Sequence, residues 1–405
     1  MKTTSLIQRV KNLYLSAMLF TVGGVLLGAE ADLTVTKTTA LAPKVPGQER
    51  IAKILLGEVT AVAAQKGWLQ EAFAKCNARA ELVNVSSGNA VAEISLLDRG
   101  DLHITSRMAY AALQQRANGL DAVVIWQGVN AHPRRATTIV LADSPIHSVA
   151  DLKGKTFGAS LINCPYYASR EAIKAEGLDV DTEFQKGDIR FVNITGVGAV
   201  SAFLAGRIDA YGTHPAIPSS APLYLQNQIR EITTAIPDGV YVTSGGRAMC
   251  FAMRQWANEN PDLVKAYLTA WDKTVRWLNS DNGAHFEEAA QIAAREIREP
   301  KPVALYDLKD ESRISWSWGQ TNYQDAVNSV KRLQNYAIAI KDPFYTKHHL
   351  SDKEIGAFID KRFFAGGEYF VDTSEHPQKL PTQADTVRPG DAAEGIQLAE
   401  TGHPQ

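Results

Sequence analysis

Glycines, hydroxyl side chains and one arginine follow short apolar runs at several places in the sequence. Arg107 comes directly after a predicted strand, where its guanidinium could bind a carboxylate or sulfonate through two parallel hydrogen bonds. Loops that open helices present backbone N–H groups, and a helix N-terminus favours negative charge. These features predict a site for a small anionic ligand. The predicted ligand-binding residues are Glu58, Val59, Ser87, Asn89, Ser106, Arg107, Asn163, Tyr166, Gly196, Gly198 and His214.

Three of these residues have an alternative role that the sequence leaves open. Arg107 could bridge two loops as a structural residue, and His214 could be a histidine satisfied by its neighbours. Glu58 would repel an anion but would attract an amine, so a ligand with both charges would suit both Glu58 and Arg107. The charge of the ligand therefore stays open at this point.

Spacings typical of catalytic, metal and nucleotide sites are missing from the chain. Neither CxxC nor HExxH occurs. The Gly196-Val197-Gly198 loop resembles the start of a dinucleotide fingerprint, but Ser201 replaces the third glycine. The three cysteines, Cys76, Cys164 and Cys250, allow one disulfide at most, and the sequence does not select a pair. We expect no catalytic residue, no metal and no cofactor.

The N-terminus has the layout of a secretory signal peptide. Lys2, Arg9 and Lys11 precede an apolar run from Leu13 to Leu27, and Ala29-Glu30-Ala31 supplies a cleavage site. The first cysteine is Cys76, too far away for lipidation at the cleavage site. We predict a cleaved signal peptide over residues 1–31 and a periplasmic protein. An uncleaved anchor is the alternative.

Charge and composition exclude one class of partner. The chain carries 42 Lys and Arg against 44 Asp and Glu, a net charge of −2. Removing residues 1–31 takes away three positive charges and one negative charge, which gives −4. No basic block remains to follow a nucleic-acid backbone, so we expect no nucleic-acid partner.

The elements that must position the site residues alternate between short strands and helices, which is typical of parallel βαβ units. Two similar stretches, 96–105 and 203–213, each end a helix with a glycine and continue through an aspartate into a strand. Their separation, together with a length beyond the usual size of one core, predicts two α/β lobes. Chance recurrence of the pattern is the alternative.

The predicted organisation divides the mature chain into four parts. Lobe 1 takes residues 32–135 and returns over 247–371 with C-terminal helices, lobe 2 takes 136–246, and 372–405 is a disordered tail. Strands are predicted over 51–56, 81–85, 156–159, 189–194 and 248–253, and a helix over 166–176. Three further helices begin near Pro261, Phe286 and Tyr323, and Ser351 begins a capping box.

Four motifs in order resemble one protein family. They are 139–146 followed by 149–155, then Leu204 to Ala210, then Asn260 to Leu268, with Gly67-Trp68-Leu69 where the family has a helix end. Together they resemble the substrate-binding proteins of ABC transporters for sulfonates, taurine and nitrate, a group that includes thiamine-precursor proteins. The resemblance covers residues 50–365.

The resemblance implies a type II periplasmic-binding fold with two lobes and two crossover segments, whose hinge closure is read by an ABC permease and its ATPase. It implies a monomer that is not an enzyme. The related aromatic sulfinate desulfinases need a cysteine after the first strand, and Leu55 to Val59 contains none. Their Arg-x-Gly-Gly motif is also missing, because Met108, Ala109 and Tyr110 follow Arg107. A sensory binding protein that docks on a membrane receptor is a further alternative.

Overall fold

The computed structural model describes residues 49–373 apart from 86–89, 128–137, 162–163, 181–185, 195, 214–219, 221–222, 224–225, 233–247, 317–321, 340 and 343. The predicted signal peptide, the crossover segments and nearly all of the predicted tail lie outside the described residues. Within the described part, no helix combines the length and apolar character needed to cross a bilayer.

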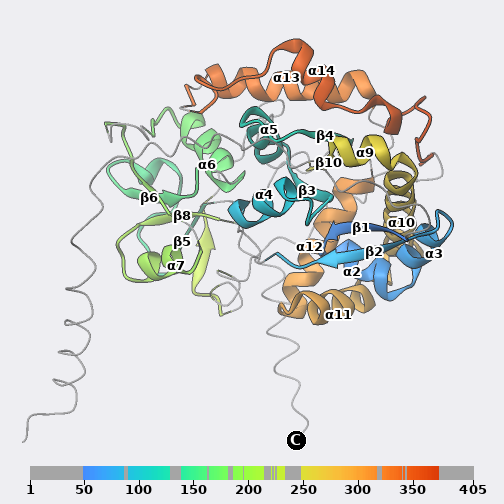
Figure 1. Cartoon of the computed structure of the whole chain (residues 1–405). Coiled ribbons are helices and arrows are strands. Elements are labelled where there is room, and N and C mark those ends of the chain that lie inside the picture. Colours follow the sequence, from blue (N-terminus) through green and yellow to red (C-terminus); the bar gives the residue numbers. More distant parts are fainter. Residues whose placement is uncertain are drawn as a thin grey trace, which may run out of the picture. The chain divides into compact units, whose positions relative to one another are not determined.

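The first sheet has the strand order β2-β1-β3-β10-β4 (Figure 1). Its strands are β1 (Arg50–Leu55), β2 (Ala78–Val83), β3 (Ile104–Met108), β4 (Ala122–Gln127) and β10 (Ala248–Met253). Strands β2, β1 and β3 are parallel, and β10 runs antiparallel between β3 and β4. The strand that completes this sheet therefore comes from a distant part of the chain.

The second sheet has the strand order β7-β6-β8-β5-β9. Its strands are β5 (Thr138–Leu141), β6 (Thr156–Ala159), β7 (Arg190–Asn193), β8 (Ala210–Gly212) and β9 (Ile229–Glu231). Strands β7, β6 and β8 are parallel, and β5 runs antiparallel between β8 and β9. The two sheets thus share one topology, and the chain passes between them twice, after β4 and after β9.

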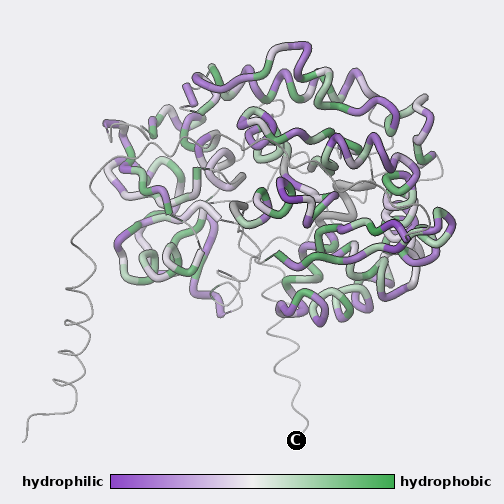
Figure 2. Tube along the Cα trace, in the orientation of Figure 1, coloured by the Kyte–Doolittle hydropathy of each residue, from purple (hydrophilic) through white to green (hydrophobic). Residues whose placement is uncertain are grey.

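Helices flank both sheets, and we call each sheet with its helices a lobe. The first lobe has α2 (Glu58–Gln65), α3 (Trp68–Ala74), α4 (Ala90–Asp98), α5 (Ala109–Ala117) and the C-terminal helices α9 (Arg254–Glu259), α10 (Pro261–Asn279), α11 (Phe286–Ile297), α12 (Lys301–Trp316), α13 (Tyr323–Ala339) and α14 (Asp352–Phe358). The second lobe has α6 (Cys164–Ala175) and α7 (Gly196–Leu204). Figure 2 shows hydrophilic and hydrophobic positions alternating along α11 and α13, as expected for helices that cover a core on one side.

Local sequence signals explain many of the element boundaries. The strands predicted at 156–159 and 248–253 are confirmed as β6 and β10, and Pro261 opens α10 as predicted. The capping box is confirmed, since Ser351 Oγ accepts from the Glu354 N–H at 3.3 Å and the Glu354 carboxylate accepts from the Ser351 N–H at 2.7 Å. Gly67 lies between α2 and α3 with a φ of 76°, where a residue with a Cβ would be strained.

Helix α12 is the main element that the sequence patterns do not predict. Charged residues from Lys309 to Arg313 interrupt its apolar periodicity, so the 3.6-residue pattern is weak there. The strand predicted over 81–85 begins earlier than expected, because β2 covers Ala78–Val83. Neither Cys76 nor Cys250 forms a disulfide.

The hydrophobic core differs between the two faces of the second sheet. Ile139 and Tyr211 belong to a small cluster with Phe203 of α7. The residues next to them, Val140 and Ala210, belong to a larger cluster that also fills the first lobe. Because neighbouring strand residues point to opposite faces, the face covered by α6 is continuous with the core of the first lobe, and the face covered by α7 is separate.

Candidate functional site

Several of the predicted site residues that the structure describes lie at the carboxyl ends of parallel strands, the edge where open α/β sheets bind ligands. In the first sheet, β1 leads to Glu58 at the start of α2, and β3 carries Ser106 and Arg107 at its end. In the second sheet, β7 leads to Gly196 at the start of α7. The predicted residues Ser87, Asn89, Asn163 and His214 lie outside the described residues.

Arg107 is held by a buried carboxylate. Its Nε donates to Glu93 Oε1 at 2.8 Å, and its Nη2 also pairs with the Glu93 carboxylate. Glu93, in the first half of α4, is 1% exposed and also accepts from the Thr105 hydroxyl at 2.6 Å. Arg107 therefore links β3 to α4 and not two loops, as the structural alternative had it, and its contact with an anion stays a prediction.

Two predicted residues have side chains enclosed in the protein. Val59 is 0% exposed within α2, and Tyr166 is 0% exposed on α6. The Tyr166 hydroxyl accepts from Arg170 Nη1 at 2.9 Å, and its ring packs edge-on against Phe191. These contacts give both side chains a packing role, and ligand contact by either stays a prediction.

Open space surrounds the start of α7. Gly196 has a φ of 65°, and a Cβ built on Gly196 or Gly198 would meet no atom within 4 Å. Val197 between them is 76% exposed. Among the described residues, no atom occupies the space beside the Cα of either glycine, and ligand contact by Gly196 and Gly198 stays a prediction.

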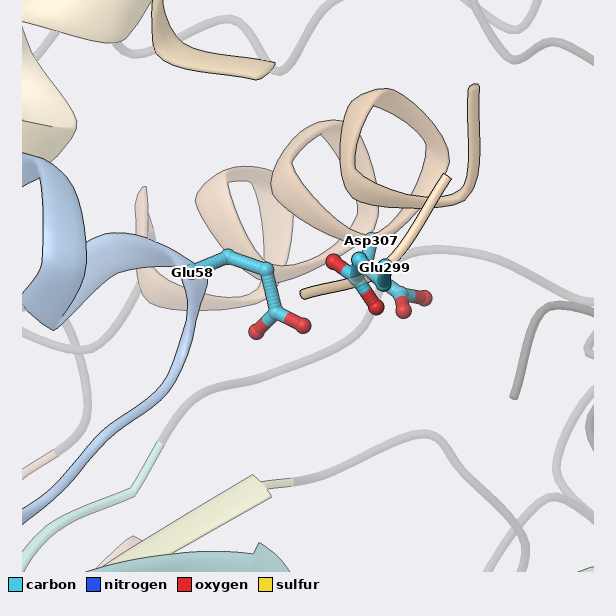
Figure 3. Close-up of side chains that lie close together, drawn as sticks. All are labelled: Glu58, Glu299 and Asp307. Atoms are coloured by element: carbon cyan, nitrogen blue, oxygen red, sulfur yellow. The ribbon is translucent and has the colours of Figure 1, made fainter. Parts of the chain in front are cut away.

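Glu58 belongs to an acidic cluster that the sequence analysis missed. Carboxylate oxygens of Glu58, Glu299 and Asp307 lie within 4.8 Å of one another (Figure 3). Glu299 lies between α11 and α12, and Asp307 lies on α12, so the cluster joins parts of the chain more than 200 residues apart. No local sequence signal marks such a cluster, apart from the unexpected charge of Glu58.

One carboxyl of the cluster binds its proton more tightly than an isolated carboxyl does. The pKa of Glu299 is raised to about 8, first by burial and second by the charge of the neighbouring Glu58. Near neutral pH, Glu299 thus keeps its proton while acidic neighbours surround it. Three such oxygen donors could hold a divalent cation or the ammonium group of a ligand, because either would relieve the repulsion between the carboxylates.

A family model described as NMT1/THI5 like matches residues 59–282. A putative aliphatic sulfonates-binding protein of Escherichia coli strain K12 is 25% identical over 211 residues, which are 52% of this chain and 60% of that protein. The alignment therefore spans less than two thirds of the relative's length.

Solved structures with low sequence identity share the fold. The alkanesulfonate-binding protein SsuA from Xanthomonas axonopodis pv. citri, bound to MOPS, superposes with a TM-score of 0.58 at 17% identity and covers 78% of this chain and 99% of its own. The desulfurization enzyme DSZB superposes with a TM-score of 0.50 at 14% identity, covering 81% and 99%. The predicted two-lobed type II periplasmic-binding fold is thereby confirmed, and this fold also carries enzymes.

Proposed function

The chain belongs to the NMT1/THI5-like family, and from this premise we propose that it is the solute-binding component of an ABC importer. It captures a small organic anion of the sulfonate type between its lobes and presents it to a permease and its ATPase. The main support is the pair of α/β sheets with one topology, between which the chain passes twice. In such sheets the carboxyl edge is where ligands bind. Lobe closure around a ligand supplies the signal that a permease reads.

The charges at the site narrow the ligand class. Arg107 carries a positive charge at the end of β3, whereas Glu58 opens α2 beside two further carboxyls. An anion without a positive group would meet repulsion at Glu58. Sulfonates that also carry an amine suit both charges, so we place them first among the organic anions.

The enzymatic alternative has less support from the residues. The loop after β1, Leu56 to Gly57, contains no cysteine, and Cys250 is 0% exposed beside Tyr267. A nucleophilic thiol needs access to its substrate and stabilisation of the thiolate. Burial raises the pKa of the Cys76 thiol, which makes this cysteine a weak nucleophile. We therefore propose a binding protein and not an enzyme.

The proposed location is the periplasm, with residues 1–31 removed on export. The support is the order of charged, apolar and small residues in that segment. We further propose that the mature protein is a monomer. N-terminal sequencing of exported material tests the cleavage: a start near Asp32 supports it, and a start at Met1 contradicts it.

A thermal-shift screen of residues 32–405 tests the function. The compounds are aminosulfonates, simple sulfonates, sulfate esters, carboxylates, nitrate and pyrimidines. A ligand that binds only the folded protein adds about 2.7 kcal/mol of stability at ~100 times its dissociation constant, which is a visible shift. Shifts confined to sulfonates, and largest for aminosulfonates, support the proposal. A shift with pyrimidines alone, or with no compound, argues against a sulfonate-binding protein.

A further inference from the structure

Among the described residues, side chains of the two lobes are in contact where α6 faces α5 and the turn after α13. Arg170 of α6 forms an ion pair with Asp342 of the turn, with Nη1 and Oδ2 3.4 Å apart. The two side chains are 4% and 2% exposed. Next to this pair, the ring of Tyr167 from α6 packs on the ring of Tyr110 from α5. Helix α5 of the first lobe and helix α6 of the second are therefore in direct side-chain contact.

Asp342 organises the first-lobe side of this contact. Its Oδ1 accepts from the N–H groups of Phe344 and Tyr345, each at 3.0 Å, which closes the turn on the carboxylate. Tyr345 then donates its hydroxyl to the carbonyl of Tyr110 at 3.1 Å. The turn and the start of α5 are thus fixed to each other before α6 is considered.

The contact is dry and aromatic. Tyr110, Tyr167 and Tyr345 are each 1% exposed or less. Tyr345 also packs edge-on against Tyr110, with ring centroids 5.3 Å apart. Separating α6 from α5 would expose these rings to water on both sides and would uncover the Arg170–Asp342 pair.

The distribution of the core agrees with a lasting connection. The large hydrophobic cluster contains residues of both lobes, and Tyr110 and Tyr167, whose rings are in contact, belong to it. The cluster under α7 on the other face of the second sheet stays separate. A contact that opened with every cycle of binding would split the larger core each time.

We propose that Tyr110, Tyr167, Arg170, Asp342 and Tyr345, here called the clasp, form a permanent third connection between the lobes and the pivot about which they rotate. The pivot role rests on the proposed function, because it presupposes lobes that open and close. The clasp lies close to the predicted site along the chain, since Tyr110 follows Arg107 by three residues and Tyr167 follows Asn163 by four. Rotation about the clasp moves the predicted binding loops of the two lobes relative to each other, while the first turns of α5 and α6 stay in contact.

Hydrogen exchange on the mature protein without any ligand tests the clasp. A permanent pivot keeps the amides of α5, α6 and residues 344–346 protected at all times. A latch that forms only on ligand capture leaves them in fast exchange without ligand. Slow exchange in all three segments supports the proposal, and fast exchange in α6 together with the turn overturns it.

Arg170→Met supplies the second arm, because it replaces the cation with an apolar chain of similar length. We expect at least tenfold faster exchange in α6 and in the turn after α13, hence on both lobes. Arg254→Met is the matched control: Arg254 pairs with Asp121 at 2.7 Å within the first lobe, so faster exchange should stay near β4 and α9. Unchanged exchange in the turn of Arg170→Met overturns the proposal.

If Arg170→Met does not fold, Tyr167→Leu removes the aromatic contacts with Tyr110 of the first lobe and Tyr166 of the second, and keeps the ion pair. A smaller rise, about threefold and again in both lobes, is expected. Faster exchange confined to the second lobe overturns the proposal. Both variants are read without ligand, so they remain decisive whether or not a sulfonate is found to bind.

Discussion

The two sheets share one strand order, yet they fix the same backbone position with different side chains. In the first sheet, the imidazole Nδ1 of His103 accepts from the backbone N–H of Lys53 at 3.1 Å. The backbone N–H of His103 donates to the carbonyl of Lys53 at 2.8 Å. In the second, Asp209 Oδ2 accepts from the Thr156 N–H at 2.7 Å, and Asp209 N–H donates back at 2.8 Å. An imidazole in one sheet and a carboxylate in the other therefore accept a hydrogen bond from the neighbouring strand at equivalent positions.

The difference continues to the ends of the strands. Counting from Gly100 and Gly206, His103 matches Asp209, and Arg107 matches Thr213. The first sheet thus ends in a charged pair with Glu93, and the second ends in a buried hydroxyl. One topology can carry a charged residue at this position in one lobe and a neutral residue in the other, because side chains at strand ends are not constrained by the pairing of the strands.

The largest effect is expected from Arg107→Ala, which removes the charged residue at the end of β3. It leaves the Glu93 carboxylate buried without its cation, which costs about 3–5 kcal/mol. Urea unfolding measures the loss. The matching Thr213→Ala removes only a hydroxyl and should cost about 1 kcal/mol. The double variant Arg107→Ala/Glu93→Gln should recover most of the loss; equal losses in single and double variants would contradict the role of Glu93.

A smaller effect is expected from pH, because the side chain at the matching position is the imidazole of His103 in the first sheet and the carboxylate of Asp209 in the second. Burial lowers the pKa of His103 to about 4, so the folded protein keeps it neutral where the unfolded chain takes up a proton. The contribution of the neutral His103 to the free energy of unfolding is fully present above pH 6.5. It decreases by about 2–3 kcal/mol between pH 6.5 and 4. Urea midpoints across this range measure it. His103→Asn should flatten this part of the profile, and an unchanged slope would assign the loss to other groups.

The smallest effect concerns the acidic cluster, which only the first lobe has among the described residues. The pKa of Glu299, raised to about 8, makes the folded protein bind a proton that the unfolded chain releases, so stability falls as pH rises from 4.5 to 8. Glu58→Gln removes a neighbouring charge, lowers the pKa of Glu299 and should make this fall shallower by about 1 kcal/mol. Titration of Glu299 by NMR checks the direction. A Glu299 pKa that does not move would show that burial alone sets it.

Sequence reasoning found the fold because the fold follows from local periodicity. Strand–helix alternation and the two glycine-closed helices predicted the paired lobes, and both glycines have positive φ, 73° at Gly100 and 66° at Gly206. The aspartates of the two stretches are not equivalent in the structure. Strand pairing places His103 at the position of Asp209, and Asp101 pairs with the Lys53 side chain.

The site was harder to predict because its contacts are not local. Glu93 reaches Arg107 from another element, and Glu299 and Asp307 reach Glu58 from a part of the chain more than 200 residues away. A single sequence does not show that these side chains are close together in space. Arg107 was found because the sequence predicts a strand that ends next to it, although β3 includes this residue, and Glu58 was found because it opens a helix. Their partners have no comparable local signal.

The position of β10 has a consequence for how the chain folds. β4 pairs within its sheet with β10 alone, and β10 begins at residue 248, after all five strands of the second sheet. The second sheet is contiguous in the chain and can assemble by itself, whereas β4 has to wait for the return of the chain. The long segment between β4 and β10 loses conformational entropy when its ends come together, and this loss comes before the strands can pair. Formation of this part of the sheet is therefore slow. The topology thus gives a growing chain an order of assembly in which the half begun first is finished last.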